Sequence, residues 1–588
     1  MNRSGASRVR LGAGLLLAAT GALGGFACGS NPSDGTAMRT GAAGAGGSAN
    51  ASGAGGLGNT AGSGAGAGAN TAGNTAAGGN PGVGGNGSGG SPIATGGLCT
   101  EPQRVLPKPE LVLSLVDSFH EGWLASPAVA DLDADGKNEI IAARGGRVIV
   151  WGNDGKKRWS FDATGRIWAS PVVADLTPAP GLEIAFAARD HIYILDQAGN
   201  VQPGFPVVWK DELRSIAAAD VDGDGKLDLI VSLAKGGGQP DIVAAYRADG
   251  SKVAGFPPNE AKASGCDDKC YRAGCYDQNL AVADVDGDGK ADVFAPHDNA
   301  YASFHKGTGE AFDANAAYPK VKKTPGVRYL HALAEAAQGY AEDEETALQA
   351  HFTNTAPALA DLDGDGKLDV IMLGSVQNAA QSKRELGVGL WAVHADAGRL
   401  AGFETPVHFP FYMAGLWDFE GTNVVGATNQ VSVADITAGS PGPEIVFAGF
   451  DGVVHAVSAS GKPLWAHTFT NTPQVLTGGV VLGDLDADGG AEVVYATYSP
   501  EKNRSAVYIV DPCGRELAAI VLPDRGAMPV PTLADVDGDG TVEIVISLKD
   551  AQDGAPGVLV YRVPGSNAKY LPWPTGRGNL RRSGTASP

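Results

Sequence analysis

The chain has 588 residues, and its 65 acidic against 44 basic residues give a formal net charge of −21. An acidic chain without a basic stripe lacks the counter-charge that phosphates need, so we expect no nucleic-acid partner. Beyond the N-terminal region there is no long uninterrupted apolar run, so we expect no membrane-spanning helix there.

The first 28 residues have the layout of an export signal. Arg3, Arg8 and Arg10 precede the apolar stretch LGAGLLLAATGALGGFA, which ends at Cys28. Ala27 before Cys28 resembles a bacterial lipobox, in which the cysteine is lipidated and becomes the mature N-terminus. We therefore predict a signal peptide over 1–28 and a lipid anchor at Cys28 that holds the exported protein in the cell envelope, at the outer membrane or surface. Plain secretion after cleavage is the alternative.

Residues 29–98 consist almost wholly of Gly, Ala, Ser, Asn and Thr, without the apolar spacing that a core requires. We predict a disordered linker. A flexible chain of about 70 residues spans on the order of 45 Å, so this linker would hold a folded domain, residues 99–588, away from a membrane.

The motif Asp-x-Asp-x-Asp-Gly-x-x-Asp/Glu occurs six times in this domain, beginning at Asp131, Asp220, Asp284, Asp361, Asp484 and Asp535. With four acids each, the six loops hold 24 of the 65 acidic residues. Carboxylates packed so densely repel one another unless a hard cation lies among them, and oxygen-rich loops suit calcium. An EF-hand is excluded, because position 12 lacks the bidentate Glu and β-branched runs such as EIIAA follow the loops.

Two worn copies, which begin at Asp175 and Asp435, keep only the acids at the two ends of the motif. All eight copies lie between short apolar runs, and two further strand-like runs follow most of them. Four antiparallel strands repeated at about fifty residues predict an all-β propeller. Eight copies favour eight blades, with seven as the alternative, and the wider spacings predict insertions around 235–280 and 297–355.

The six loops resemble those of the FG-GAP or VCBS repeat family, the propeller class that includes the integrin α-subunit head. Two Gly-Phe-Pro turns, at 204–206 and 255–257, add to the resemblance, which covers roughly residues 105–580. It implies about six bound Ca²⁺ ions, held by the acids at positions 1, 3, 5 and 9 and by the carbonyl at position 7. The implied ligands are Asp131, Asp133, Asp135, Lys137, Glu139, Asp220, Asp222, Asp224, Lys226, Asp228, Asp284, Asp286, Asp288, Lys290, Asp292, Asp361, Asp363, Asp365, Lys367, Asp369, Asp484, Asp486, Asp488, Gly490, Glu492, Asp535, Asp537, Asp539, Thr541 and Glu543.

Five cysteines remain after Cys28, and an exported protein is expected to oxidise them. The spacing of Cys266, Cys270 and Cys275 is not the paired CxxC of a zinc site, and we predict a local disulfide within this cluster. Cys99 and Cys513 form a second possible pair, because the two ends of a propeller chain meet near the last blade.

The insertion over 297–355 supplies candidates for a second site, because insertions between blades project on one face. They are His297, Asp298, His305, His331 and His351. The alternative is that these scattered histidines are packed or solvated, since they lack the HxH or HExxH spacing of a metal site.

Three functions fit these features. The first is a surface-displayed module that binds or adheres to an extracellular polysaccharide or protein. The second is a calcium-dependent polysaccharide lyase, because a rhamnogalacturonan lyase family also uses an eight-bladed, calcium-loaded propeller; His297, Tyr301, Arg328 and Tyr329 would then be proton-transfer candidates. The third is a quinoprotein dehydrogenase-like propeller, suggested by the turns before Trp159 and Trp465, although these tryptophans also suit outer strands. No nucleophile or nucleotide-binding motif is present, which favours the non-catalytic module.

The C-terminal run YLPWPTGRGNLRRSGTASP resembles the segment that follows the last blade in bacterial members of the family. We predict that Trp573 and Pro574 pack against the first blade, so that both chain ends close the ring and leave no open sheet edge.

Overall fold

A computed structural model describes the C-terminal domain of the chain. The described residues are 105–117, 120–209, 212–233, 241–266, 279–296, 302–327, 349–352, 355–377, 385–410, 429–437, 440–449, 451–472, 474–551 and 554–586. The predicted signal, the linker and Cys28 lie outside these ranges, and so do large parts of both predicted insertions. Among the described residues, no helix has the length and apolarity that crossing a bilayer requires.

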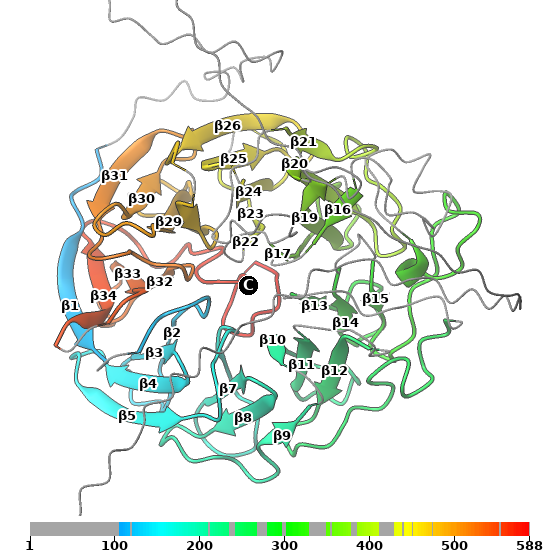
Figure 1. Ribbon diagram of the computed structural model, residues 1–588, viewed down its shortest axis with the longest axis horizontal. Coiled ribbons are helices and arrows are strands. Elements are labelled where there is room, and N and C mark those ends of the chain that lie inside the picture. Colours follow the sequence, from blue (N-terminus) through cyan, green and yellow to red (C-terminus); the bar gives the residue numbers. More distant parts are fainter. Residues whose placement is uncertain are drawn as a thin grey trace, which may run out of the picture. The chain divides into compact units, whose positions relative to one another are not determined.

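Eight antiparallel sheets radiate around a central axis as the blades of a propeller, which confirms the predicted fold class and blade count (Figure 1). We number the blades in chain order. Blade 1 contains β2 (Ala128–Ala130), β3 (Glu139–Arg144), β4 (Arg147–Gly152) and β5 (Lys157–Asp162), and blade 2 contains β6 (Val172–Ala174), β7 (Glu183–Ala188), β8 (His191–Leu195) and β9 (Val207–Val208). Blade 3 contains β10 (Leu213–Ala219), β11 (Asp228–Leu233) and β12 (Val243–Tyr246), and blade 4 contains β13 (Ala281–Ala283), β14 (Asp292–Phe294) and β15 (Phe304–His305).

Blades 5 to 8 complete the ring, and in blades 5 and 7 two short strands pair with different parts of one long second strand. Blade 5 contains β16 (Gln349–His351), β18 (Ala358–Ala360), β19 (Asp369–Gln377), β20 (Glu385–Val393) and β21 (Val407–Phe409), and blade 6 contains β23 (Ser432–Ala434), β24 (Glu444–Ala448), β25 (Val453–Val457) and β26 (Pro463–Thr468). Blade 7 contains β27 (Leu476–Thr477), β28 (Val481–Gly483), β29 (Glu492–Tyr498), β30 (Ala506–Val510) and β31 (Glu516–Val521), and blade 8 contains β32 (Thr532–Ala534), β33 (Val542–Ser547), β34 (Pro556–Val563) and β1 (Glu110–Val116).

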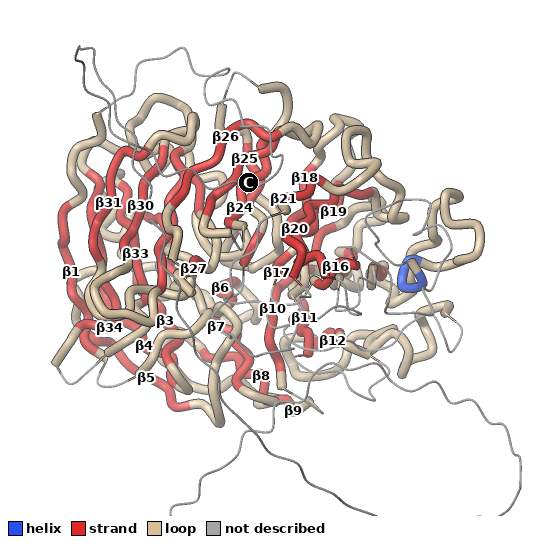
Figure 2. Tube along the Cα trace, turned by 45° about the horizontal axis from the view of Figure 1, so that its top comes forward, coloured by secondary structure: helices blue, strands red, loops and turns tan. Residues whose placement is uncertain are grey.

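Two minor elements lie outside the blade sheets. β17 (Thr355–Ala356) and β22 (Asn429–Gln430) form a parallel pair, and η2 (Thr324–Gly326) is a single 3₁₀ turn. A tilted view shows that the described chain consists almost entirely of strands and loops (Figure 2).

The core lies between the blades. The second strands β3, β7, β11 and β33 are buried along their whole length, whereas the outer strand β5 is mostly exposed. Each large hydrophobic cluster joins neighbouring blades; one combines Ile141 and Val150 of blade 1 with Ile184 and Phe186 of blade 2. A strand covered on both faces carries a continuous apolar run, which explains the β-branched stretches after the carboxylate loops.

Trp159 and Trp465 lie on the outer strands β5 and β26, as expected, and each also contacts the next blade. The indole N–H of Trp159 donates to the carbonyl of Gln197 at 2.9 Å, and that of Trp465 donates to the carbonyl of Pro512 at 2.8 Å. They therefore link blade 1 to blade 2 and blade 6 to blade 7.

The N-terminal strand closes the ring. β1 pairs antiparallel with β34, so the outermost strand of blade 8 comes from the start of the domain and its other strands come from the end. Blade 8 is therefore built from both ends of the domain, which ties the start of the domain to its last blade. Cys513 and Cys266 are both disulfide-bonded, while Cys99, Cys270 and Cys275 lie outside the described residues, so the pairings stay predictions.

The C-terminal residues 570–585, here called the central segment, run through the middle of the ring (Figure 1). Seven blade amides donate to carbonyls of this segment: those of Asp484, Leu482, Leu533, Val173, Ala218, Val282 and Leu359. The carbonyl of Pro127, next to β2 of blade 1, accepts from Arg582 at 3.1 Å, and the carbonyl of Asp435 in the loop of blade 6 accepts from the hydroxyl of Tyr570 at 2.8 Å. Gln430, which precedes blade 6, accepts from the amide of Arg577 at 2.5 Å. The central segment thus has a hydrogen bond to every blade.

The predicted contact of Trp573 and Pro574 with the first blade is wrong. Trp573 forms a bridge with Leu482 of blade 7 and is fully buried in the cluster that blades 5 to 7 share, and the carbonyl of Pro574 accepts from Leu533 of blade 8. The chain turns inward after β34 and meets the innermost strands of blades 7 and 8 first. Blade 1 is reached later, through Thr575 and Arg582.

Candidate metal-binding loops

The six complete motif copies form loops with one shared backbone geometry, and each joins the innermost strand of a blade to the second strand. The glycine at position 6 is left-handed in all six, with φ between +82° and +90°. Position 4 is left-handed as well, with Gly in four loops and with Ala134 and Ala487 at φ +60° in the other two. Glycine adopts this conformation without steric cost, which explains its recurrence at both positions. The recurrence at position 4 is visible in the sequence, although the motif is defined without it.

Backbone amides orient the carboxylates in each loop. The Asp at position 1 accepts the amide of the glycine at position 6 at 2.8 to 3.0 Å in all six loops. The Asp at position 5 accepts the amide of residue 7 at 2.7 to 2.9 Å, and these amides belong to Lys137, Lys226, Lys290, Lys367, Gly490 and Thr541. Local hydrogen bonds therefore hold the acids together despite their mutual repulsion.

The carboxylates converge closely enough to hold a cation. In at least five loops, three acids each place an oxygen within 4.8 Å of the other two; these groups include Asp131, Asp133 and Glu139; Asp220, Asp222 and Asp228; Asp284, Asp286 and Asp292; Asp361, Asp363 and Asp365; and Asp484, Asp486 and Asp488. In the loop of blade 8, Arg562 pairs with Asp537, Asp539 and Glu543. All the acids implied as ligands thus lie in loops of this kind, although their role as ligands stays a prediction.

The closing acid at position 9 has a second task that the motif did not predict. In all eight blades the closing acid accepts the amide of the residue at position 2 at 2.6 to 3.1 Å; the worn copies do this with Glu183 at position 9 and with Glu444 at position 10. In blade 2, the hydroxyl of Thr177 donates to the other oxygen of Glu183 at 2.7 Å. Through this hydrogen bond the closing acid, at the start of the second strand, holds the beginning of the loop in place, even in the two copies that lack the central acids.

Burial makes the closing acids costly to ionise. It raises the pKa of Glu492 to about 8 and that of Asp292 and Glu543 to about 7, while the pKa values of Asp228 and Asp369 rise to about 6. Loss of hydration is the largest cause in each case, and neighbouring acids of the same loop add to it. A cation bound among these acids would favour their charged forms.

Basic side chains approach the acid at position 3 of the loop in three blades, and Arg158 lies 3.6 Å from the closing acid Glu139 in blade 1. Arg247 pairs with Asp222 in blade 3, Lys306 donates to Asp286 at 2.7 Å in blade 4, and Arg562 pairs with Asp537 in blade 8. They offset part of the negative charge at position 3. A bound cation would compete with them, so we expect these three loops to bind cations less tightly than the others.

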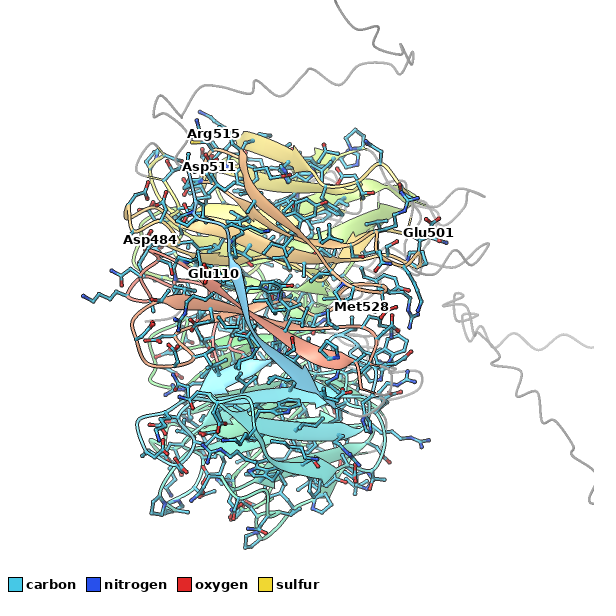
Figure 3. The ribbon with its side chains drawn as sticks, turned by 90° about the vertical axis from the view of Figure 1, so that its left-hand side faces the viewer. Glu110, Asp484, Glu501, Asp511, Arg515 and Met528 are labelled. Atoms are coloured by element: carbon cyan, nitrogen blue, oxygen red, sulfur yellow. The ribbon has the colours of Figure 1, made fainter. Side chains whose placement is uncertain are left out.

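The carboxylate loops lie on one face of the ring, and the approaches to the innermost strands lie on the other. In an edge-on view, Asp484 of the loop in blade 7 lies at one edge, and Glu501 and Met528 lie at the opposite edge (Figure 3). This arrangement follows from the chain direction, because every loop leaves the end of an innermost strand.

The second-site histidines are not brought together as a site in the described residues. His297, Asp298 and His331 lie outside them, as do Tyr301, Arg328 and Tyr329, and His351 is described only as part of strand β16. His305 is 1% exposed, and its Nδ1 lies 3.2 Å from the carbonyl of Gly309. Its surroundings are those of a packed core histidine.

Burial lowers the pKa of His305 to about 4, so the folded protein keeps this ring neutral where an unfolded chain would protonate it. The unfolded state then binds more protons, and stability falls as the pH drops from 6.5 toward 4. We expect His305→Asn to remove up to about 3 kcal/mol of this pH dependence. The measurement is the free energy of unfolding in urea at pH 7.5 and pH 4.5 for both proteins. If the free energy of unfolding falls by the same amount between pH 7.5 and pH 4.5 in both proteins, the expectation is contradicted, because the carboxylate loops titrate alike in both.

Comparison with known proteins supports the fold. No protein-family model and no curated protein matches the sequence. Among solved structures, the domain is similar to the Vibrio cholerae biofilm matrix protein Bap1, with a TM-score of 0.50 and 15% identity over 82% of this chain and 97% of that one. Weaker likenesses include the rhamnogalacturonan lyase YesW, with a TM-score of 0.42 and 15% identity over 81% and 80% of the chains. Another is the quinohemoprotein alcohol dehydrogenase of Comamonas testosteroni, with a TM-score of 0.40 and 13% identity over 78% and 77%. At 15% identity the similarity to Bap1 supports the fold alone and says nothing of the function of this chain.

Proposed function

We propose that this protein is a calcium-binding propeller of the FG-GAP or VCBS type that acts as a binding or adhesion module at the cell surface. The observation that carries the proposal is the repetition of one loop geometry, with converging carboxylates, on a single face of the ring. Calcium takes six to eight oxygen ligands in flexible geometry, and carboxylates grouped by short loops supply such oxygens. Acids of positions 1, 3, 5 and 9 would hold the ion.

Calcium would act here as a structural ion. Each loop joins two strands whose positions define a blade, so an ion held only in the folded state stabilises the fold. A rigid ring then presents its opposite face as a fixed surface. Lipidation at Cys28 and the linker over 29–98 would place that surface outside the cell, where the partner is an extracellular polysaccharide or protein.

The test is retention of the purified 99–588 domain on arrays of acidic and neutral polysaccharides, first with calcium and then with a chelator. We expect retention on an acidic polysaccharide, reduced at least tenfold by chelation, and no unsaturated uronate in the eluate. Unsaturated products would replace the adhesion function with a lyase. Retention on no polysaccharide would point to a protein partner and overturn the polysaccharide part of the proposal.

A further inference from the structure

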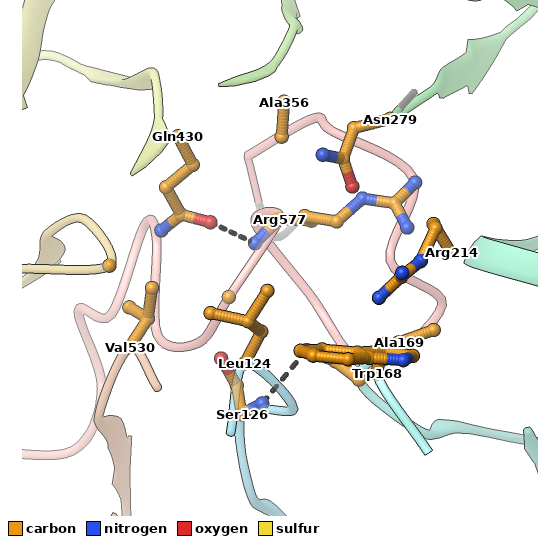
Figure 4. A pocket seen from close by; sticks show the side chains of 13 residues that line it. Leu124, Ser126, Trp168, Ala169, Arg214, Asn279, Ala356, Gln430, Val530 and Arg577 are labelled. Atoms are coloured by element: carbon orange, nitrogen blue, oxygen red, sulfur yellow. Dashed lines mark hydrogen bonds between the residues drawn. The ribbon is translucent and has the colours of Figure 1, made fainter. Parts of the chain in front are cut away.

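A small pocket lies beside the central segment, at the ends of the innermost strands opposite the carboxylate loops. Figure 4 shows the side chains that line it. Its walls come from segments that lead into the innermost strands, with Ser126, Trp168, Arg214, Asn279 and Gln430, and its floor includes Arg577 of the central segment. Ala356, Gly478 and Val530 add the remaining three blades, so all eight blades and the C-terminal segment build one site. The cavity has a volume of about 40 Å³.

The charge of this pocket is opposite to that of the protein. Two of its thirteen lining residues are arginines and none is acidic, in a chain with a net charge of −21. Glu212, which does not line the pocket, lies 3.6 Å from Nη2 of Arg214 and offsets part of that charge, so Arg577 is the cation without a carboxylate partner. Arg577 is only 7% exposed, and within the described ranges no carboxylate forms an ion pair with it. A buried cation without a counter-ion is costly, so an anion that reaches it gains more than it would at the surface.

Arg577 keeps its charge because carbonyl and hydroxyl oxygens solvate it. One terminal nitrogen donates to Ser215 Oγ at 2.6 Å and to the carbonyl of Ile216 at 2.8 Å, and the other donates to the carbonyl of Leu280. Burial lowers its pKa to about 9, which leaves it protonated at neutral pH. Its Nε–H has no hydrogen-bond partner among the described residues.

The second arginine is held at the rim by an aromatic support. The guanidinium carbon of Arg214 lies 4.1 Å from the ring centroid of Trp168, whose indole N–H donates to Glu212 at 2.7 Å. The Trp168 ring in turn packs edge-on against Trp123 with centroids 5.1 Å apart, and Arg166 lies over both rings. The support restricts the side chain of Arg214 before any ligand arrives, which reduces the entropy lost on binding.

We propose that this pocket binds the carboxylate of a uronic acid residue in an acidic saccharide, between the guanidinium groups of Arg214 and Arg577. This inference rests on the proposed function of polysaccharide binding and names the chemistry of its ligand. A single ordered water needs about 10–15 Å³, so the cavity of about 40 Å³ admits a carboxylate but not a whole sugar ring. The ring of the sugar would stay at the rim beside Trp168. Planar carboxylates match the fork of an arginine better than rounder anions do.

Isothermal titration of the calcium-loaded 99–588 domain with D-glucuronate, D-glucose, acetate and phosphate tests the proposal. We expect D-glucuronate to bind more tightly than acetate or phosphate, and D-glucose to show no binding. Arg214→Gln should weaken glucuronate binding about tenfold or more, and Arg214→Lys should weaken it less, because the charge stays while the fork is lost.

Arg504→Gln is the matched control, because Arg504 is exposed, pairs with Glu501 at 3.5 Å and does not line the pocket. It should bind glucuronate like the parent protein. Acetate or phosphate binding as tightly as glucuronate would overturn the assignment to a sugar acid. Unchanged glucuronate affinity in Arg214→Gln would overturn the site. If the parent protein is retained on acidic polysaccharide but does not bind glucuronate, the pocket proposal fails alone; if neither is seen, the proposed polysaccharide function fails with it.

Discussion

Deletion of residues 570–588 is expected to leave a chain that does not form a stable ring. The deletion removes the acceptors of seven blade amides and the buried side chain of Trp573, which is 0% exposed. With about 1 kcal/mol for each hydrogen bond and about 3–5 kcal/mol for a buried tryptophan, the loss is on the order of 10 kcal/mol. That equals most of the 5–15 kcal/mol by which folded domains are usually stable.

The deletion is measured by thermal melting and by the hydrodynamic radius in the presence of calcium. Removal of residues 586–588 alone is the control, because Ala586 is exposed and the hydrogen bonds of the central segment end at Thr585. A synthetic peptide of residues 569–588 added to the long deletion should restore cooperative melting. A long deletion that melts at the parent temperature would show that the blades hold the ring without the central segment.

Arg144→Ala is expected to lower the free energy of unfolding by about 3–5 kcal/mol. Arg144 ends strand β3 of blade 1 and forms an ion pair with Asp117, which follows β1, and both side chains are 0% exposed. It also donates to Ser547 Oγ at 2.9 Å and to the carbonyl of Leu548 at 2.6 Å in blade 8. The substitution leaves the charge of Asp117 buried without a partner at the point where the ring closes.

Arg147→Ala is the matched control, three residues away at the start of β4. Arg147 also pairs with an aspartate, Asp162, but their side chains are 27% and 70% exposed. An exposed pair contributes less than about 1 kcal/mol, so this variant should unfold almost like the parent protein. Chemical denaturation with calcium present compares the three proteins. Equal destabilisation in both variants would show that the buried pair does not secure the closure.

Much of the fold was predictable from the sequence because each blade is encoded locally. The motif spacing predicted eight blades, and the β-branched runs after each loop predicted buried second strands such as β3 and β33. The loop geometry is local too, since Asp131 bonds to the amide of Gly136 only five residues away. Nothing in such short patterns depends on distant parts of the chain.

The repeated blade, the carboxylate loop and the number of copies can be read from the sequence without the structure. The closure of the ring, the path of the central segment and the lining of the central pocket follow from the folded chain alone. β1 pairs with β34 across more than four hundred residues, and Arg577 lines the same pocket as Arg214 because the central segment returns through the middle of the ring. These arrangements bring together residues far apart in the chain, and no local spacing or hydrophobic period records which distant surfaces will bury one another.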